Sequence, residues 1–152
     1  MELQAIFNKA HSHFKTMGEP SMTSLDNDAD NASASSSSCS YRGSGGAMCA
    51  VGVFIEDQYY SDSLEGNAIL STNGSDLDIN VQKAVAYSFK QGRLSDEQLN
   101  LLCALQRVHD DNSEDLWCGT FLLAYEDDTT AWYKICEDKL RAVAAKFNLK
   151  FN

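Results

Sequence analysis

The densest group of ionisable side chains in the sequence is His109-Asp110-Asp111, with Glu114 and Asp115 close behind it. A histidine beside a carboxylate can act as a general base that the carboxylate orients. A structural role also fits, because His109 falls in the last turn of an expected helix, where a cation meets the helix dipole favourably. We interpret these residues as the end of one helix followed by an acidic loop that caps the next.

Cys49 is a second candidate, as a nucleophile. Gly45-Gly46 precede it, and Arg42 is a nearby cation of the kind that stabilises a thiolate. The apolar residues Ala50-Val51 follow it directly, which favours a buried thiol. Neither reading is decided by the sequence.

The remaining cysteines and histidines give no metal or cofactor motif. No cysteine pair has the CxxC spacing of a zinc ribbon or a thioredoxin-type site, and His11 and His13 point to different faces of a helix. An odd number of cysteines without a cationic signal segment predicts reduced thiols and a cytoplasmic protein. Three cysteines lie in apolar patterns and are expected in the core: Cys103, Cys118 and Cys136.

The net charge of −10, from 12 Lys+Arg against 22 Asp+Glu, excludes a sequence-wide basic surface for nucleic acid. No stretch reaches the roughly 18 apolar residues of a membrane span. Many of the acids fall at helix starts or loops, where they are locally favourable. The alternative is a negatively charged, nucleic-acid-like surface for a basic protein partner. Its candidate residues are Glu56, Asp57, Asp110, Asp111, Glu114, Asp115, Glu126, Asp127 and Asp128.

The elements that must position these groups are mainly helical, and we expect one compact domain over residues 1–152. Apolar residues recur at helical spacing over 2–17, 79–89, 95–109, 116–125 and 128–147, about five helices. Ser95 and Gln98 form a capping-box pattern. The acidic and Ser-rich segment 22–38 is expected to be a mobile insertion. Residues 48–55 are either a buried strand or a short helix packed through Gly52, so a minor β element is open near 39–55.

The segment 41–66 contains the motif Tyr41-Arg42-Gly43, Cys49-Ala50-Val51-Gly52 and Leu64-Glu65-Gly66. Together with the opening helix, Leu102–Asp110 and a closing amphipathic helix, this motif resembles that of a widespread family of small proteins encoded by bacteria and their phages. The resemblance implies a bacterial or phage origin and a compact helical fold, and it supplies no catalytic residue. This chain departs from the family in its long 22–38 segment and in Glu56, where a proline is usual.

Three hypotheses for the function follow, of which the third is a structural or housekeeping domain with no separable site. The first is a non-enzymatic accessory protein that binds a protein with a basic surface, in a phage setting as an inhibitor of a host or defence factor. The second is an enzyme or small-molecule-binding domain with its site on the 41–66 segment. A concave pocket containing Tyr41, Arg42, Cys49 and Glu65 would favour the second, and its motif residues are Tyr41, Arg42, Gly43, Cys49, Gly52, Glu65 and Gly66.

Overall fold

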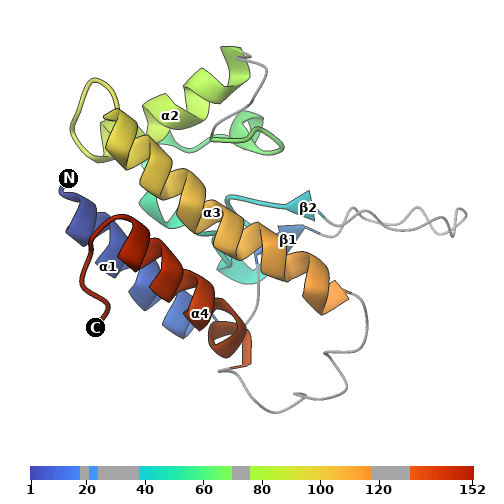
Figure 1. Cartoon of the computed structure of the whole chain (residues 1–152). Helices are drawn as coiled ribbons and strands as arrows, with labels where there is room; N and C mark the ends of the chain where they lie inside the picture. The colour runs from blue at the N-terminus through green and yellow to red at the C-terminus, as the bar shows by residue number, and fades with distance from the viewer. Residues whose placement is uncertain (18–20, 24–37, 70–75, 118–130) are drawn as a thin grey trace, which may run out of the picture.

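The computed structural model describes residues 1–17, 21–23, 38–69, 76–117 and 131–152. Over these residues the chain is mainly helical, as the sequence predicts, with four α-helices: α1 (Leu3–Thr16), α2 (Asp76–Ser88), α3 (Asp96–Trp117) and α4 (Ala131–Lys146). Helices α1, α3 and α4 pack against one another, whereas α2 packs on the short turns of the segment before it (Figure 1). None of the described helices is long and apolar enough to cross a membrane.

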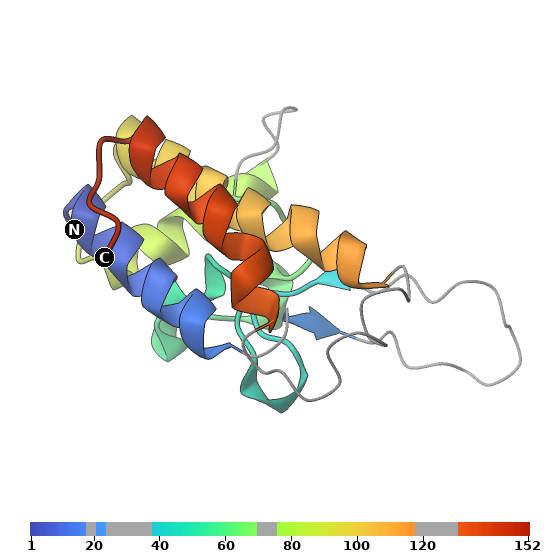
Figure 2. The same ribbon diagram turned by 60° about the horizontal axis from the view of Figure 1, so that its bottom comes forward.

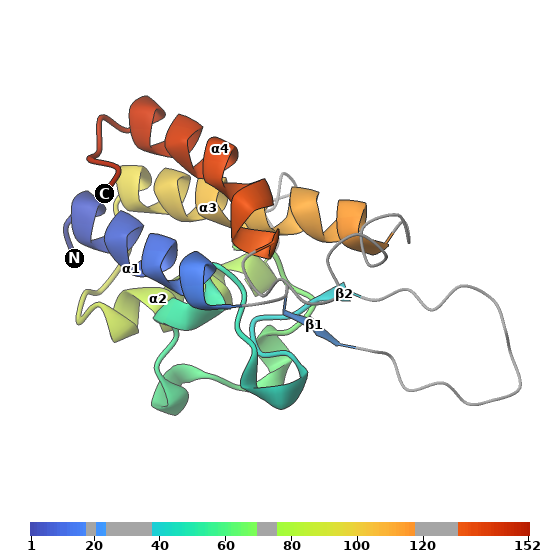
Figure 3. The same cartoon turned by 90° about the horizontal axis from the view of Figure 1, so that it is seen from below.

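The buried faces of the helices follow the apolar spacing of the sequence. In α1 the side chains of Ile6, Phe7, Ala10 and Phe14 are almost completely buried, which confirms the amphipathic helix expected over 2–17. They meet apolar residues of α3 and α4 in one core that includes the fully buried Trp132. Figures 2 and 3 show α4 lying along both α1 and α3, so that the three helices form one unit.

Helix α3 begins at the predicted capping box and ends later than predicted. The backbone N–H of Ser95 donates to Gln98 Oε1 at 2.9 Å, and the backbone N–H of Gln98 donates to Ser95 Oγ at 3.2 Å. The helix continues to Trp117, so His109 is not in its last turn and residues 110–115 are not a loop. Nothing between residues 110 and 117 is glycine or proline, and buried His109 is hydrogen-bonded to Ser21 and Cys39 from distant segments.

The other expected helices fall partly outside the described residues. Helix α2 confirms the helix expected over 79–89, and α4 confirms most of the one expected over 128–147. For the helix expected over 116–125, residues 118–130 are outside the described part of the chain. The same holds for residues 24–37 of the predicted mobile insertion.

The β structure is minor. Strand β1 (Met22–Thr23) pairs antiparallel with β2 (Ser38–Cys39), with Met22 opposite Cys39, and an isolated bridge joins Arg42 to Met48. This confirms a small β element near the start of 39–55.

The apolar run that follows is helical rather than a strand. It forms the 3₁₀ turn η2 (Gly52–Phe54), and three further 3₁₀ turns occur nearby: η1 (Ser44–Gly46), η3 (Asp57–Tyr59) and η4 (Asp62–Leu64). A Cβ at Gly52 would lie 2.0 Å from the Tyr41 carbonyl oxygen, so the turn packs directly on the backbone of the preceding segment. Gly52 therefore has the packing role that the sequence suggested.

Candidate functional site

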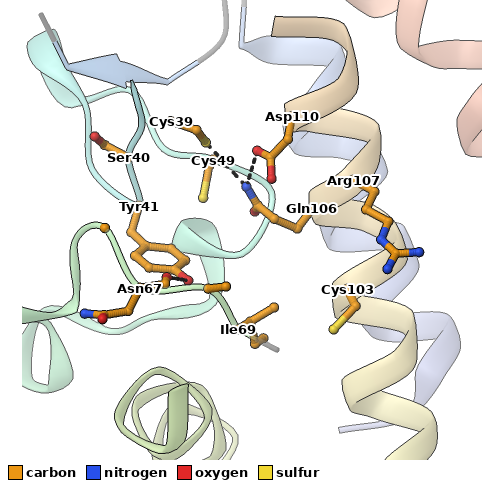
Figure 4. Close-up of a pocket in the computed structure, with 12 residues that line it drawn as sticks. Cys39, Ser40, Tyr41, Cys49, Asn67, Ile69, Cys103, Gln106, Arg107 and Asp110 are labelled. Carbon is orange, nitrogen blue, oxygen red and sulfur yellow. Dashed lines mark hydrogen bonds between the residues drawn. The ribbon is translucent and has the colours of Figure 1, made fainter. Parts of the chain in front are cut away.

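A pocket of about 400 Å³ lies between segment 39–69 and α3 (Figure 4). This size is typical of sites for small molecules. One side is lined by residues of the segment and the other by residues of α3: Cys39, Ser40, Tyr41, Cys49, Gly66, Asn67, Ala68 and Ile69, and Cys103, Gln106, Arg107 and Asp110. The pocket contains three of the motif residues, Tyr41, Cys49 and Gly66.

The spacing along α3 explains which of its residues line the pocket. Residues three and four apart on a helix lie on one face, and Cys103, Gln106 and Asp110 follow that spacing. Arg107 lies beside them and is exposed. Cys103 was expected in the core, but it is only partly buried and lines the pocket, whereas Cys136 is fully buried as predicted. Cys118 is outside the described residues.

Gln106 connects the two sides of the pocket. Its Oε1 accepts the backbone N–H of Val51 at 3.1 Å, which turns its Nε2 toward the pocket. Nε2 donates to Asp110 Oδ1 at 2.6 Å and to Cys39 Sγ at 3.4 Å, as Figure 4 shows. The Val51 backbone N–H therefore sets the orientation of the Gln106 amide, and this amide in turn holds the Asp110 carboxylate and the Cys39 thiol.

His109 is fully buried behind this face, and its hydrogen bonds identify its tautomer. The backbone N–H of Ser21 donates to His109 Nε2 at 3.1 Å, so Nε2 is an acceptor and the neutral ring carries its proton on Nδ1. Nδ1 lies 3.2 Å from Cys39 Sγ and 3.1 Å from Asp110 Oδ1, and its one proton is shared between these two acceptors. In this arrangement His109 is a hydrogen-bond donor to Cys39 rather than its general base.

The same geometry bears on metal binding. One ligand atom each of Cys39, His109 and Asp110 lie within 4.8 Å of one another. A metal ion at His109 Nδ1 would require the ring proton to sit on Nε2, directly opposite the Ser21 N–H. The hydrogen bonds therefore fit a thiol and a carboxylate held by the imidazole, and they do not fit a metal ion.

Cys39 and Cys49 are free thiols that both line the pocket. The backbone N–H of Gly52 donates to Cys49 Sγ at 3.3 Å. The interaction with Cys49, followed by burial, raises the pKa of the Cys39 thiol well above its usual range. Loss of the proton from Cys39 is therefore disfavoured.

Glu65 holds the beginning of the motif in place. Its carboxylate accepts the backbone N–H groups of Tyr41 at 2.9 Å and Arg42 at 3.0 Å, and the Tyr60 hydroxyl at 2.9 Å. Burial, and next the hydrogen bond to Glu65, raise the pKa of Tyr60 to about 12. The Tyr41 hydroxyl donates to the backbone oxygen of Asn67 at 2.6 Å, which closes the loop over the pocket.

Arg42 is also a structural residue. Its guanidinium donates to the Ile55 backbone oxygen at 3.1 Å, pairs with Asp57 at 2.7 Å and lies 4.2 Å from the centre of the Tyr60 ring. Arg42 and Glu65 therefore support the pocket without lining it. Of the four residues whose common pocket would favour the second hypothesis, Tyr41 and Cys49 line this pocket, and Arg42 and Glu65 do not.

The motif glycines serve backbone geometry. The backbone N–H of Gly43 donates to Ser21 Oγ at 2.9 Å, and Gly66 has φ +74°, in the left-handed region that favours glycine. Gly52 allows the close approach to Tyr41 described above.

The acidic residues proposed for a partner surface come from separate elements. Glu56 and Asp57 lie at the start of η3, and Asp57 pairs with Arg42. Asp110 faces the pocket, and Asp111 is exposed beside it on α3. Glu114 and Asp115 belong to the α3 backbone, while Glu126, Asp127 and Asp128 are outside the described residues. A shared acidic face stays a prediction.

Sequence reasoning missed three residues of this site: Gln106, Cys39 and Ser21. Gln106 has the i,i+4 spacing of a hydrogen-bonded pair with Asp110, which was the available signal. Cys39 and Ser21 stand at the edges of the acidic and Ser-rich segment and carry no pattern of their own. Ser21 is fully buried and contacts residues 40, 43, 47 and 109, which no local spacing could show.

A scan against protein-family models, a search of the curated proteins and a search of the solved structures each find no match to this chain. The resemblance to bacterial and phage proteins stays a prediction. The two stretches that carry it, 41–66 and 102–110, meet at this pocket through Val51 and Gln106.

Proposed function

We propose that this protein binds a small polar molecule in the pocket between segment 39–69 and α3. The observation that carries the proposal is the arrangement of the pocket lining: the Cys39 thiol and the Asp110 carboxylate lie in one pocket of about 400 Å³ and are both held by Gln106 and buried His109. Pockets of this size with a few oriented polar groups are the usual sites of small ligands. This is the second of the three hypotheses drawn from the sequence.

The charges of the pocket define the class of ligand. Arg107 supplies an exposed cation, and Asp110 supplies an anion that is 46% exposed. Both come from α3, one turn apart, while Tyr41 and Ile69 provide apolar surface opposite them. A molecule with a carboxylate and an ammonium group, such as an amino acid or a short peptide, is complementary to this lining.

The test uses S-methylglutathione, a zwitterionic peptide with no reactive sulfur, and saturation-transfer NMR on the reduced chain. We expect binding that weakens about tenfold in Arg107→Gln, because a charge-assisted hydrogen bond contributes roughly 1.5–3 kcal/mol. Arg93→Gln is the matched control, since Arg93 is exposed and does not line the pocket. Equal affinities of the two variants, or no saturation transfer from the wild-type protein to the peptide, would contradict the proposal.

The accessory role through a basic protein partner is a separate proposal that rests on the charge of −10. Asp111 is an exposed acid on α3 that neither lines the pocket nor belongs to η3. The test is the affinity for a cationic peptide in the double variant Asp111→Asn/Glu56→Gln. An affinity equal to that of the wild type would count against this proposal.

A further inference from the structure

Two free thiols share one wall of the pocket. Cys39 and Cys49 both line it, and both are free. Figure 4 shows them side by side, with Gln106 and Asp110 facing them from α3. Two neighbouring thiols can form a disulfide when side-chain movement brings their sulfurs to about 2 Å.

The surrounding donors point at the sulfur pair. His109 Nδ1 and Gln106 Nε2 donate to Cys39 Sγ at 3.2 and 3.4 Å, and the Gly52 backbone N–H donates to Cys49 Sγ at 3.3 Å. The raised pKa of Cys39 opposes loss of its proton, and these N–H donors would stabilise the thiolate that the exchange requires. Such charge-assisted hydrogen bonds are the stronger kind, and thiolate is the form that reacts.

The two sulfurs differ in access. Cys39 is partly exposed, whereas the Cys49 residue is 1% exposed and lies behind it. In thiol–disulfide exchange the accessible thiol attacks first, and a second thiol within reach resolves the mixed disulfide. Their positions assign Cys39 to the first step and Cys49 to the second.

We propose that Cys39 and Cys49 exchange disulfides with a low-molecular-weight disulfide of amino-acid or peptide type bound in the pocket. The inference rests on the proposed small-molecule site and names its substrate. A disulfide of this type carries the carboxylate and ammonium groups that Arg107 and Asp110 complement, next to the sulfurs that must react.

The exchange is balanced in two steps. Cys39 Sγ attacks one sulfur of the ligand, so that a Cys39–ligand S–S bond forms, the ligand's S–S bond breaks, and the departing thiolate takes a proton. Cys49 Sγ then attacks Cys39 Sγ, which forms the Cys39–Cys49 disulfide and releases the second thiol. The protein pair loses two electrons and two protons, and the ligand disulfide gains them as two thiols.

The experiment adds glutathione disulfide to the reduced full-length chain, blocks remaining thiols with N-ethylmaleimide and maps disulfides by mass spectrometry. We expect a Cys39–Cys49 disulfide in the wild type and a glutathione adduct on Cys39 in Cys49→Ser. Oxidation should slow on the order of tenfold in Cys39→Ser, because a buried thiol must then attack. Cys103→Ser removes another pocket thiol, and the same Cys39–Cys49 disulfide should still form in this variant.

Several results would overturn the exchange. One is a disulfide or adduct that involves Cys103 in place of Cys39, and another is equal rates in Cys39→Ser and Cys103→Ser. If Cys49→Ser does not fold, acid quenching of the wild-type reaction should trap the same glutathione adduct on Cys39. The absence of that adduct from the quenched reaction would also contradict the exchange. S-methylglutathione binding without exchange would remove this inference and leave the proposed function, whereas failure of both would remove both.

Discussion

The contact between Gly52 and the backbone of Tyr41 allows a quantitative test of how the pocket is built. Gly52→Ala adds a single carbon, which would lie 2.0 Å from the Tyr41 carbonyl oxygen and 2.8 Å from its carbonyl carbon. Real Cβ atoms essentially never come closer than 3.0 Å, so one of the two backbone segments must move by about 1 Å or more. The obstacle is backbone, so no rotamer change relieves it.

The expected cost follows from what holds Tyr41. Its backbone N–H is bound by Glu65 at 2.9 Å and its hydroxyl by the Asn67 backbone oxygen at 2.6 Å, so the segment cannot shift freely. Overpacking of this kind costs about 1–3 kcal/mol, and the restricted segment places Gly52→Ala near the upper end. Alanine also lowers the conformational entropy of the unfolded chain, which stabilises the folded state by only about 0.4–1 kcal/mol. We expect a net loss of about 2 kcal/mol in the free energy of unfolding.

The measurement is urea unfolding followed by circular dichroism, with Gly92→Ala as the matched control. A Cβ at Gly92 meets nothing within 4 Å, so this variant should be unchanged or stabilised by up to about 1 kcal/mol. If Gly52→Ala unfolds within about 0.5 kcal/mol of Gly92→Ala, the close approach does not constrain the pocket and the reasoning is wrong.

Three further predictions concern stability. Burial lowers the pKa of His11 and of His13 in the folded state below the usual 6.5, so the unfolded chain takes protons first and stability is lost as the pH falls below about 6.5. In the double variant His11→Gln/His13→Gln, the unfolding midpoint should change less between about pH 7.5 and 5.5 than it does in the wild type. An equal change of the midpoint with pH in both proteins would contradict this. Glu65→Gln should cost about 1–3 kcal/mol in urea unfolding, because an amide group cannot accept all three donors that Glu65 accepts; a wild-type midpoint would refute it. Ser95→Ala removes the cap of α3 and should cost about 1 kcal/mol, and a loss below about 0.3 kcal/mol would show that the cap is dispensable.

The helices were predictable because their signals are local. The apolar spacing of Ile6, Phe7 and Phe14 and the reciprocal pair Ser95 and Gln98 can be read within one or two turns, and the structure confirms both. The end of α3 was not predictable from acids alone. A histidine followed by aspartates reads as a helix terminus, but the contacts of His109 with Ser21 and Cys39 come from distant segments.

The pocket was predictable only in part, for the same reason. The motif drew attention to Tyr41, Cys49 and Gly66, which line the pocket, but also to Arg42 and Glu65, which bind backbone groups beside it. In a sequence, a charged side chain near a candidate nucleophile predicts a catalytic or binding role for that side chain. Whether it instead satisfies backbone donors or acceptors depends on which loop folds over it.

The hydrogen bonds between backbone amides and side chains of the site also give the molecule built-in reporters of motion. The amide protons of Ser21 and Val51 are bound by His109 Nε2 and Gln106 Oε1, whereas most protected amides of a helical protein belong to helix ladders. Their exchange with deuterated solvent therefore requires α3 and the segments around the pocket to separate, even while the helices stay formed. Exchange rates at these two amides would therefore report the free energy of opening the site. Ligand binding or oxidation of the thiols should change these rates.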